Sequence, residues 1–343
     1  MDQAEGIVYF SPSEYTQHLM ARLEPAHTYR TGSLTEWQSG LYPIVREKVG
    51  VDELTPADLS PRTEWIQQAP LGTIEKVFFQ AADHATVVGY LCIPHGASEP
   101  YPVMICLQGH TSGMHRSIGR QQDDEFAPMA VPNDQDFAIS AMRNGFAALC
   151  IEQRSFGLRG ERRQALVSPH PCHDAALQAL MLGQTLVGQR VFDVDRGIDF
   201  LATRNEFDLS RIGVMGNSGG GMAAIYVAAL LPRISFAMPS CAFCEFEYSM
   251  MAMYHCADNY VPGIMQVCRM SDILGLFAPK PLVIVAGRDD PEFPLPGVLL
   301  AFERLKDIYR AGDAGDRLQL VIGEGAHRFY AQEGWAALTD LLR

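Results

Sequence analysis

Short apolar segments recur along most of the chain and alternate with segments whose apolar residues are spaced three and four apart. The apolar segments cover residues 103–107, 146–151, 212–215, 235–238, 282–285 and 318–322. Segments of this kind are typical of parallel strands that are covered on both faces. Because the segments between them have helical spacing, the pattern predicts an α/β fold with a mostly parallel sheet.

The helical segments and one hairpin complete this predicted main domain. Helices are expected at residues 134–143, 177–201, 222–230, 298–309 and 332–342. Gly183, Gly188 and Gly197 lie inside the longest of these and mark the places where it could bend or break. Two further strands, at residues 74–80 and 86–93, flank a short turn, which predicts an antiparallel hairpin at one edge of the sheet.

The first 70 residues have a different pattern. They mix polar and aromatic residues with several prolines and contain a short helical segment at residues 13–23. We predict that residues 1–70 form a helical N-terminal extension packed on a main domain of residues 71–343, with a separate functional module as the alternative. Residues 111–133 and 243–278 fit the alternation poorly, so they form either pocket walls and lids or a surface loop and extra packing helices.

Composition and charge restrict the classes of function. The chain is 48% hydrophobic and 20% charged, as in ordinary globular proteins. With 40 acidic and 27 basic residues its net charge is -13, which disfavours binding to nucleic acid or to an anionic membrane. The chain has neither a signal-peptide pattern nor an apolar run of roughly 18 residues, so we expect a soluble, cytoplasmic protein. A homo-oligomer is compatible with the sequence but not indicated by it.

The strongest motif for chemistry is Gly216-Asn217-Ser218-Gly219-Gly220, which follows an apolar strand and precedes an amphipathic helix. This is the setting of a Gly-x-Ser-x-Gly nucleophile elbow, in which the serine hydroxyl projects from a sharp turn. Glycines two before and two after the serine remove Cβ atoms that would collide across that turn. The N–H groups at the helix start favour negative charge near the hydroxyl. The alternative is a glycine-rich helix start without chemistry.

A serine needs a base and an orienting acid to act as a nucleophile at neutral pH. In chain order the acid follows the serine and the histidine comes last, each after a later strand. Asp290 follows the predicted strand at 282–285, and His327 follows the one at 318–322. Because the carboxyl ends of parallel strands open onto one crevice, Ser218, Asp290 and His327 are the predicted catalytic residues.

From about residue 74 to its end, the chain resembles the α/β-hydrolase superfamily, and within it the esterases similar to dienelactone hydrolase and acetyl xylan esterase. The residues that carry the resemblance are the 216–220 motif, Gly287 with Asp290-Pro291-x-x-Pro294, and Gly325-Ala326-His327. The resemblance implies a mostly parallel sheet of about eight strands with helices on both faces. It also implies that the acid is the residue before the first proline, Asp290, whereas a shift of one residue would select Asp289.

Two backbone N–H groups are expected to form an oxyanion hole. One belongs to Gly219, the residue after the nucleophile, and the other to the loop after residues 103–107. By resemblance to the His-Gly-x turn of esterases, the second donor is the N–H of His110. Gln108 stands where many relatives have histidine, which does not affect a backbone donor.

A metal or cofactor is not expected. Cys241-Ala242-Phe243-Cys244, with His255, Cys256 and Cys268 further along, matches no common zinc module, so buried thiols are the better interpretation. Nucleotide-binding glycine loops and the His-Glu-x-x-His motif are absent from the sequence.

These features predict a serine hydrolase that cleaves a small-molecule carboxylic ester through an acyl-enzyme on Ser218. A short acyl group such as acetyl is implied by the resemblance alone. The alternatives are a peptidase, thioesterase or lactonase that uses the same three residues, and a hydrolase-like scaffold that binds without catalysis. Residues 1–70 are too few for the large propeller that would favour a peptidase of the prolyl-oligopeptidase kind.

Overall fold

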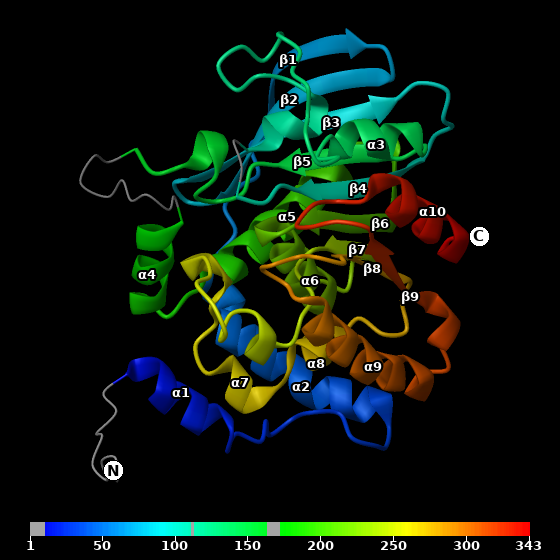
Figure 1. Ribbon diagram of the computed structural model, residues 1–343. Helices are drawn as coiled ribbons and strands as arrows, with labels where there is room; N and C mark the ends of the chain where they lie inside the picture. The colour runs from blue at the N-terminus through cyan, green and yellow to red at the C-terminus, as the bar shows by residue number, and fades with distance from the viewer. Residues whose placement is uncertain (1–10, 111–112, 163–171) are drawn as a thin grey trace, which may run out of the picture.

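A single sheet with helices on both faces carries the architecture (Figure 1). The computed structural model describes residues 11–110, 113–162 and 172–343. Within these residues the sheet has nine strands in the spatial order β1-β2-β3-β5-β4-β6-β7-β8-β9. The strands are β1 (Arg62–Ala69), β2 (Gly72–Ala82), β3 (Ala85–Pro94), β4 (Tyr101–Leu107), β5 (Ala147–Ile151), β6 (Phe207–Asn217), β7 (Phe236–Ser240), β8 (Leu282–Gly287) and β9 (Leu318–Gly323). The predicted α/β-hydrolase fold is therefore confirmed.

The strand directions agree with the sequence pattern. Neighbouring strands from β5 through β4 to β9 pair in parallel, whereas β1, β2, β3 and β5 pair antiparallel. The β2–β3 pair is the expected hairpin. The parallel strands β5, β7 and β8 are buried along their whole length and β4 along most of it, as continuous apolar segments require.

Strand β1 lies in the residues that we assigned to the helical extension. It is an edge strand of mostly polar residues, and Ile66 is 62% exposed while the neighbouring Trp65 packs toward the core. An edge strand buries little of its surface, so it leaves only a weak alternating pattern in the sequence.

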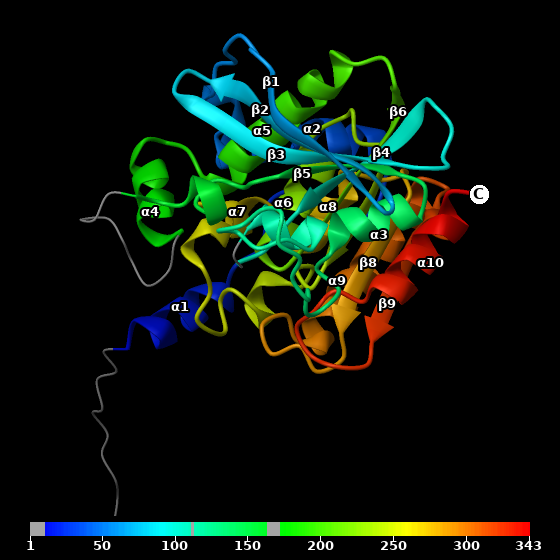
Figure 2. The ribbon, with the colours of Figure 1, turned by 90° about the horizontal axis from the view of Figure 1, so that it is seen from above.

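Helices cover the sheet unequally on its two faces (Figure 2). They are α1 (Pro12–Met20), α2 (Leu34–Val49), α3 (Phe137–Arg143), α4 (His173–Met181), α5 (Leu186–Ala202), α6 (Gly219–Leu230), α7 (Ile264–Val267), α8 (Met270–Gly275), α9 (Leu295–Ala311) and α10 (Ala331–Leu341). The larger core packs α2, α5, α6, α8 and α9 on one face. The smaller core packs α3 and α10 on the other.

The long helix expected at residues 177–201 is two helices, α4 and α5. The chain breaks at Gly183, whose φ of +75° suits glycine, and Thr185 caps α5 by accepting a hydrogen bond from Gly188 N at 2.9 Å. Gly188 and Gly197 lie inside α5, where neighbouring atoms leave no room for a Cβ atom. A Cβ at Gly188 would lie 2.1 Å from the carbonyl oxygen of Val49.

The two irregular insertions lie beside the carboxyl ends of the strands. In the first, residues 111–112 lie outside the described residues, and the rest includes a short 3-10 helix, η2 (Met114–Ile118). The second contains η5 (Phe246–Tyr248), η6 (Ala257–Asn259), α7 and α8. Among the helices described, none has both the length and the apolar character needed to cross a bilayer.

Candidate active site

Ser218 occupies a sharp turn between β6 and α6. Its backbone has φ 59° and ψ −125°, a conformation that non-glycine residues rarely adopt. A Cβ at Gly216 would lie 2.3 Å from the carbonyl oxygen of Gly220, and one at Gly220 would lie 2.0 Å from that of Leu107. The two glycines therefore permit the turn for the steric reason expected from the sequence.

The turn is held against the neighbouring strands on both sides. Ser218 N donates a hydrogen bond of 3.0 Å to the carbonyl oxygen of Ser240, at the end of β7. On the β4 side, a Cβ at Gly109 would lie 3.0 Å from Ser218 Cβ. The serine thus lies at the carboxyl ends of the strands, between the loops that follow β4 and β7.

Asp290 and His327 form a hydrogen-bonded pair, also beyond the carboxyl ends of the strands. Asp290 Oδ2 lies 2.8 Å from His327 Nδ1, and the Asp290 side chain is 1% exposed. Its Oδ1 accepts from the N–H groups of Glu292 and Phe293 at 2.9 and 3.1 Å. Asp290 follows β8 and His327 follows β9, which are adjacent strands.

The two pKa values shift in the directions that this contact favours. Burial lowers the pKa of His327, but the hydrogen bond and negative charge of Asp290 outweigh burial, so the pKa is raised. Burial raises the pKa of Asp290, and the hydrogen bond and charge of His327 outweigh it, so that pKa is lowered. The carboxylate therefore stays ionised and favours a protonated imidazole.

Asp289, the alternative acid, points elsewhere. It is exposed, and its N–H donates to the carbonyl oxygen of Gly325 at 2.8 Å. Among the described residues, the histidine therefore pairs with Asp290.

The other ring nitrogen of His327, Nε2, is buried and has no hydrogen-bond partner among the described residues. Its neighbours are Glu292 Oε2, at 3.8 Å, and the ring of Phe293, which stacks on the imidazole at 5.9 Å between centroids. A hydrogen bond between Nε2 and Ser218 Oγ is not formed here, and such bonds commonly shorten only when substrate binds.

Cys241 was not predicted as a neighbour of this pair. Its Sγ lies within 4.8 Å of the donor atoms of both Asp290 and His327. Burial, followed by the charge of Asp290, raises the pKa of this thiol to about 12. A thiol that stays protonated is a poor nucleophile, so Cys241 is not a rival to Ser218. The sequence could have indicated this position for Cys241, because the residue directly follows the buried strand β7.

The residues that carry the two proposed oxyanion donors are in contact through the His110 side chain. Gly219 is the first residue of α6, so its N–H has no partner within the helix. The His110 ring packs on Gly219, where a Cβ would lie 2.8 Å from both Cε1 and Nδ1. The loop after β4 and the residue after the serine therefore lie close together, and an oxyanion hole at this place stays a prediction.

The side chain of His110 has partners that the sequence analysis missed. Nε2 lies 3.2 Å from Asp258 Oδ1 and 3.4 Å from Cys172 Sγ. Burial lowers the pKa of His110, but the contacts with Asp258 and Cys172 outweigh it and raise the pKa to about 9. Cys172 is 62 positions and Asp258 148 positions from His110 in the chain, so no local motif joins them.

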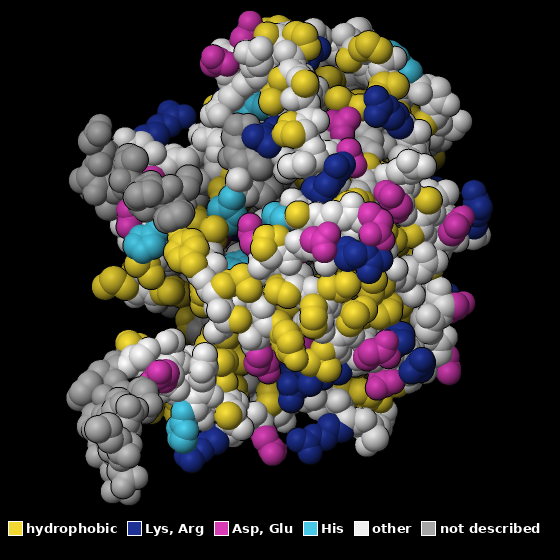
Figure 3. Space-filling view, viewed as in Figure 1, with side chains coloured by type: hydrophobic (Ala, Val, Ile, Leu, Met, Phe, Trp, Pro, Cys, Tyr) yellow, Lys and Arg dark blue, Asp and Glu magenta, His cyan; other side chains and the backbone are white. Residues whose placement is uncertain are grey.

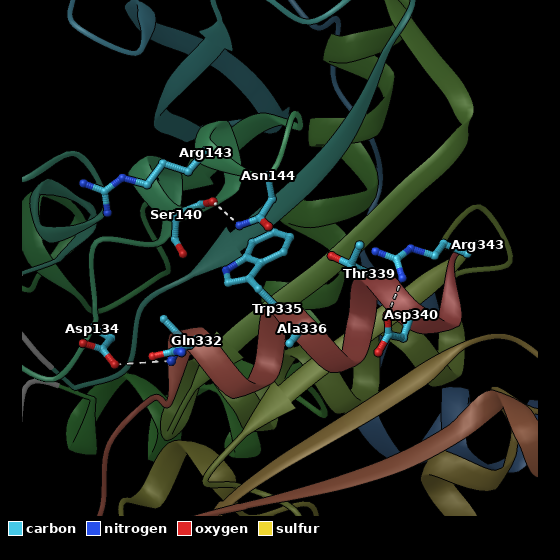
Figure 4. A pocket seen from close by; sticks show the side chains of 11 residues that line it. Asp134, Ser140, Arg143, Asn144, Gln332, Trp335, Ala336, Thr339, Asp340 and Arg343 are labelled. Carbon is cyan, nitrogen blue, oxygen red and sulfur yellow. Dashed lines mark hydrogen bonds and ion pairs between the residues drawn. The ribbon is translucent and has the colours of Figure 1, made fainter.

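Two hollows lie away from the serine. One, of about 620 Å³, lies between α3 and α10 and is lined by polar groups such as Arg143, Asn144 and Arg343 (Figure 4). It has the Asp340–Arg343 ion pair at 3.0 Å on its rim. Ser218, Asp290 and His327 do not line it, so it is separate from the candidate active site.

The second hollow is apolar and has a volume of about 450 Å³. Residues of α1, α4 and the 243–278 insertion line it, among them Leu19, Phe246 and Tyr260. Apolar side chains also gather over the α4 region at the left of Figure 3, where Met181 is 88% exposed. The catalytic candidates do not line this hollow either.

Comparison with known sequences gives consistent matches. Residues 66–306 match the Abhydrolase family. That range includes Ser218 and Asp290 and ends before His327. The Bacillus subtilis (strain 168) protein YtaP, named as a hydrolase, is 24% identical over 275 residues, which cover 78% of this chain and 87% of YtaP.

Solved structures share the fold at low sequence identity. A Bacteroides fragilis protein described as an acetyl xylan esterase superposes with a TM-score of 0.74 at 16% identity, over 94% of this chain and 84% of that one. A glucuronoyl esterase from Solibacter usitatus superposes with a TM-score of 0.66 at 16% identity, over 94% and 98% of the two chains. At these identities the likeness establishes the shared fold.

Proposed function

Because the chain belongs to the Abhydrolase family, we propose that it is a serine hydrolase that cleaves a carboxylic ester with a short acyl group. The observation behind the proposal is the strained Ser218 at the end of β6. The Asp290–His327 pair lies beyond the carboxyl ends of β8 and β9 in the same sheet. Backbone strain of this kind persists where the surroundings enforce it, and it is frequent at reactive residues.

The proposed reaction uses each group in turn. Ser218 Oγ attacks the carbonyl carbon while His327 Nε2 accepts the hydroxyl proton, and Asp290 keeps the imidazole in the required orientation. The N–H groups of Gly219 and His110 stabilise the negative oxygen of the tetrahedral intermediate. His327 returns the proton to the leaving alcohol, and the acyl group remains on Ser218.

Water completes the cycle. His327 accepts a proton from the water that attacks the acyl-enzyme, and the second tetrahedral intermediate collapses to carboxylic acid and free serine. The same machinery would hydrolyse a thioester, a lactone or an amide. Support for an oxygen ester comes from the structural neighbours, which include an acetyl xylan esterase and glucuronoyl esterases.

The nucleophile is tested by labelling with a fluorescent fluorophosphonate. The wild-type chain should react, and S218A should lose the label together with esterase activity, by a factor of about 1,000 or more. Ser210, an exposed serine on the same strand, provides the matched control. S210A should label as the wild type does.

Substrate class is tested with a series of p-nitrophenyl esters and matched thioesters. Turnover should be fastest with the acetyl ester and fall as the acyl chain lengthens. Faster turnover of thioesters or of an aminoacyl amide would replace the ester assignment with one of the alternatives. Labelling that persists in S218A would remove the proposed mechanism.

A further inference from the structure

Four side chains with metal-binding atoms meet beside the candidate active site, and the mechanism proposed above does not use them together. They are His110 from the loop after β4, Cys172 immediately before α4, and Cys256 and Asp258 at the 3-10 helix η6. One ligand atom from each lies within 4.8 Å of all the others. We propose that these four residues bind a zinc ion.

The distances from His110 Nε2 to two of the other ligand atoms suit tetrahedral coordination. Zinc binds nitrogen and oxygen at about 2.0–2.2 Å and thiolate sulfur at about 2.3 Å, so neighbouring ligand atoms lie roughly 3.3–3.8 Å apart. His110 Nε2 lies 3.2 Å from Asp258 Oδ1 and 3.4 Å from Cys172 Sγ. These two edges of the tetrahedron need almost no adjustment.

Asp258 is held by a partner outside the set of four. Its Oδ1 faces His110, and its Oδ2 lies 2.6 Å from Arg190 Nη1, in a contact where both side chains are 2% exposed or less. A ligating carboxylate is typically oriented by such a hydrogen bond to its second oxygen. The Arg190 guanidinium in turn packs on the Phe156 ring, 4.3 Å from its centroid. The carboxylate is therefore oriented before a metal arrives.

The charges also balance. Zinc with two thiolates, a neutral imidazole and a carboxylate carries one net negative charge, and the buried Arg190 guanidinium compensates it. Binding would release the thiol protons of Cys172 and Cys256, and any second proton on His110, to solvent. The sulfur ligands favour zinc over magnesium or calcium, which prefer oxygen.

A bound zinc would connect three segments around the serine. Figure 1 shows α4 beside the segment that leads to α7, at the left of the sheet. The His110 ring lies on Gly219, so fixing this ring also fixes the loop that carries one proposed oxyanion donor. This consequence rests on the proposed function, whereas zinc binding does not.

Zinc analysis of the full-length protein, purified without chelator, tests the proposal. We expect about one zinc per chain. C172A and C256A should each lose at least about tenfold in zinc affinity, since the loss of a group that only orients a ligand already costs about that much. Cys268 is a buried cysteine in the same insertion, outside the cluster, and serves as the matched control. C268A should keep its zinc.

Cobalt replaces zinc in a second measurement on the unaltered chain, which is independent of whether the variants fold. Co²⁺ added to metal-free protein should give thiolate-to-cobalt charge-transfer absorption and a tetrahedral visible spectrum, and zinc should abolish both. Absence of these bands, unchanged zinc affinity in both cysteine variants, or a Cys172–Cys256 disulfide in the purified chain would overturn the proposal. Because metal content rather than activity is measured, a failed esterase assay leaves this result unaffected.

Discussion

Ser218 shows how one residue depends on its neighbours for its conformation. A positive φ at a non-glycine residue costs of order 1–3 kcal/mol. The hydrogen bond from Ser218 N to Ser240 and the start of α6 hold the residue there. The strained conformation of the half-buried Ser218 is thus maintained by backbone contacts with its neighbours.

The pH dependence of activity should follow from the Asp290–His327 pair. Catalysis needs neutral His327, whose pKa is raised, so activity should fall as the pH drops through a value above the usual 6.5 of histidine. The groups that face the imidazole are Asp290 and Glu292 after β8, Cys241 after β7, and, further away, His110. The pH profile of kcat/KM measures this limb.

Replacing Asp290 by asparagine should change both the rate and the profile. The hydrogen bond and charge that raise the pKa of His327 are lost while burial, which lowers it, remains. The acidic limb should therefore move to lower pH, and kcat should drop by about 10,000-fold, as for other triads. D289N should leave rate and profile as in the wild type, because Asp289 is exposed and contacts its neighbours through its backbone. An unshifted limb in D290N would contradict the role given to the pair.

At the scale of elements, α6 can begin at the serine only because it lies very close to β4. A Cβ at Gly220 would lie 2.0 Å from the carbonyl oxygen of Leu107. G220A should therefore push the helix from the strand and lower the free energy of unfolding by about 2 kcal/mol or more. It should also reduce activity, since Ser218 is two residues away.

Gly40, inside α2, offers the opposite case. It is exposed, and a Cβ there would meet no heavy atom within 4 Å. G40A should raise the free energy of unfolding by about 0.5–1 kcal/mol, because alanine loses less backbone entropy in a helix. Urea denaturation of G220A and G40A measures both free energies of unfolding. Equal effects of the two substitutions would contradict the steric argument.

For the whole molecule, the two N-terminal helices differ in how they are attached. Helix α1 has no buried residue, whereas Leu41, Val45 and Val49 of α2 are fully buried in the larger core. The backbone between them is bound to the 243–278 insertion, with Ala26 N donating to Gln266 O and His27 N to Val267 O. From about residue 26 onward, the extension is therefore packed on the main domain.

Truncation tests this difference. Deletion of residues 1–23 should lower Tm by less than about 3 °C, because helix α1 has no buried residue. Deletion of residues 1–50 should cost more than about 5 kcal/mol, from loss of the α2 side chains. Thermal unfolding of the two truncated chains gives the comparison, and a large loss on the shorter deletion would show that α1 is more firmly held than its exposure indicates.

Local sequence determined much of this protein. The continuous apolar segments predicted β4 to β9 because parallel strands are buried on both faces, and they placed Ser218, Asp290 and His327 after β6, β8 and β9. The elbow was readable because its steric requirement falls on Gly216 and Gly220, two residues from the serine on either side.

Other features were decided only by the tertiary structure. Strand β1 pairs at an edge where one face meets solvent, so its sequence has little hydrophobic pattern. Asp290 rather than Asp289 turns toward His327, since consecutive side chains point in different directions and only the packed loop selects one. The contacts of His110 with Cys172 and Asp258 join distant segments. Chain periodicity records which residues are buried, whereas such contacts depend on how separate segments meet, which no short stretch of sequence encodes.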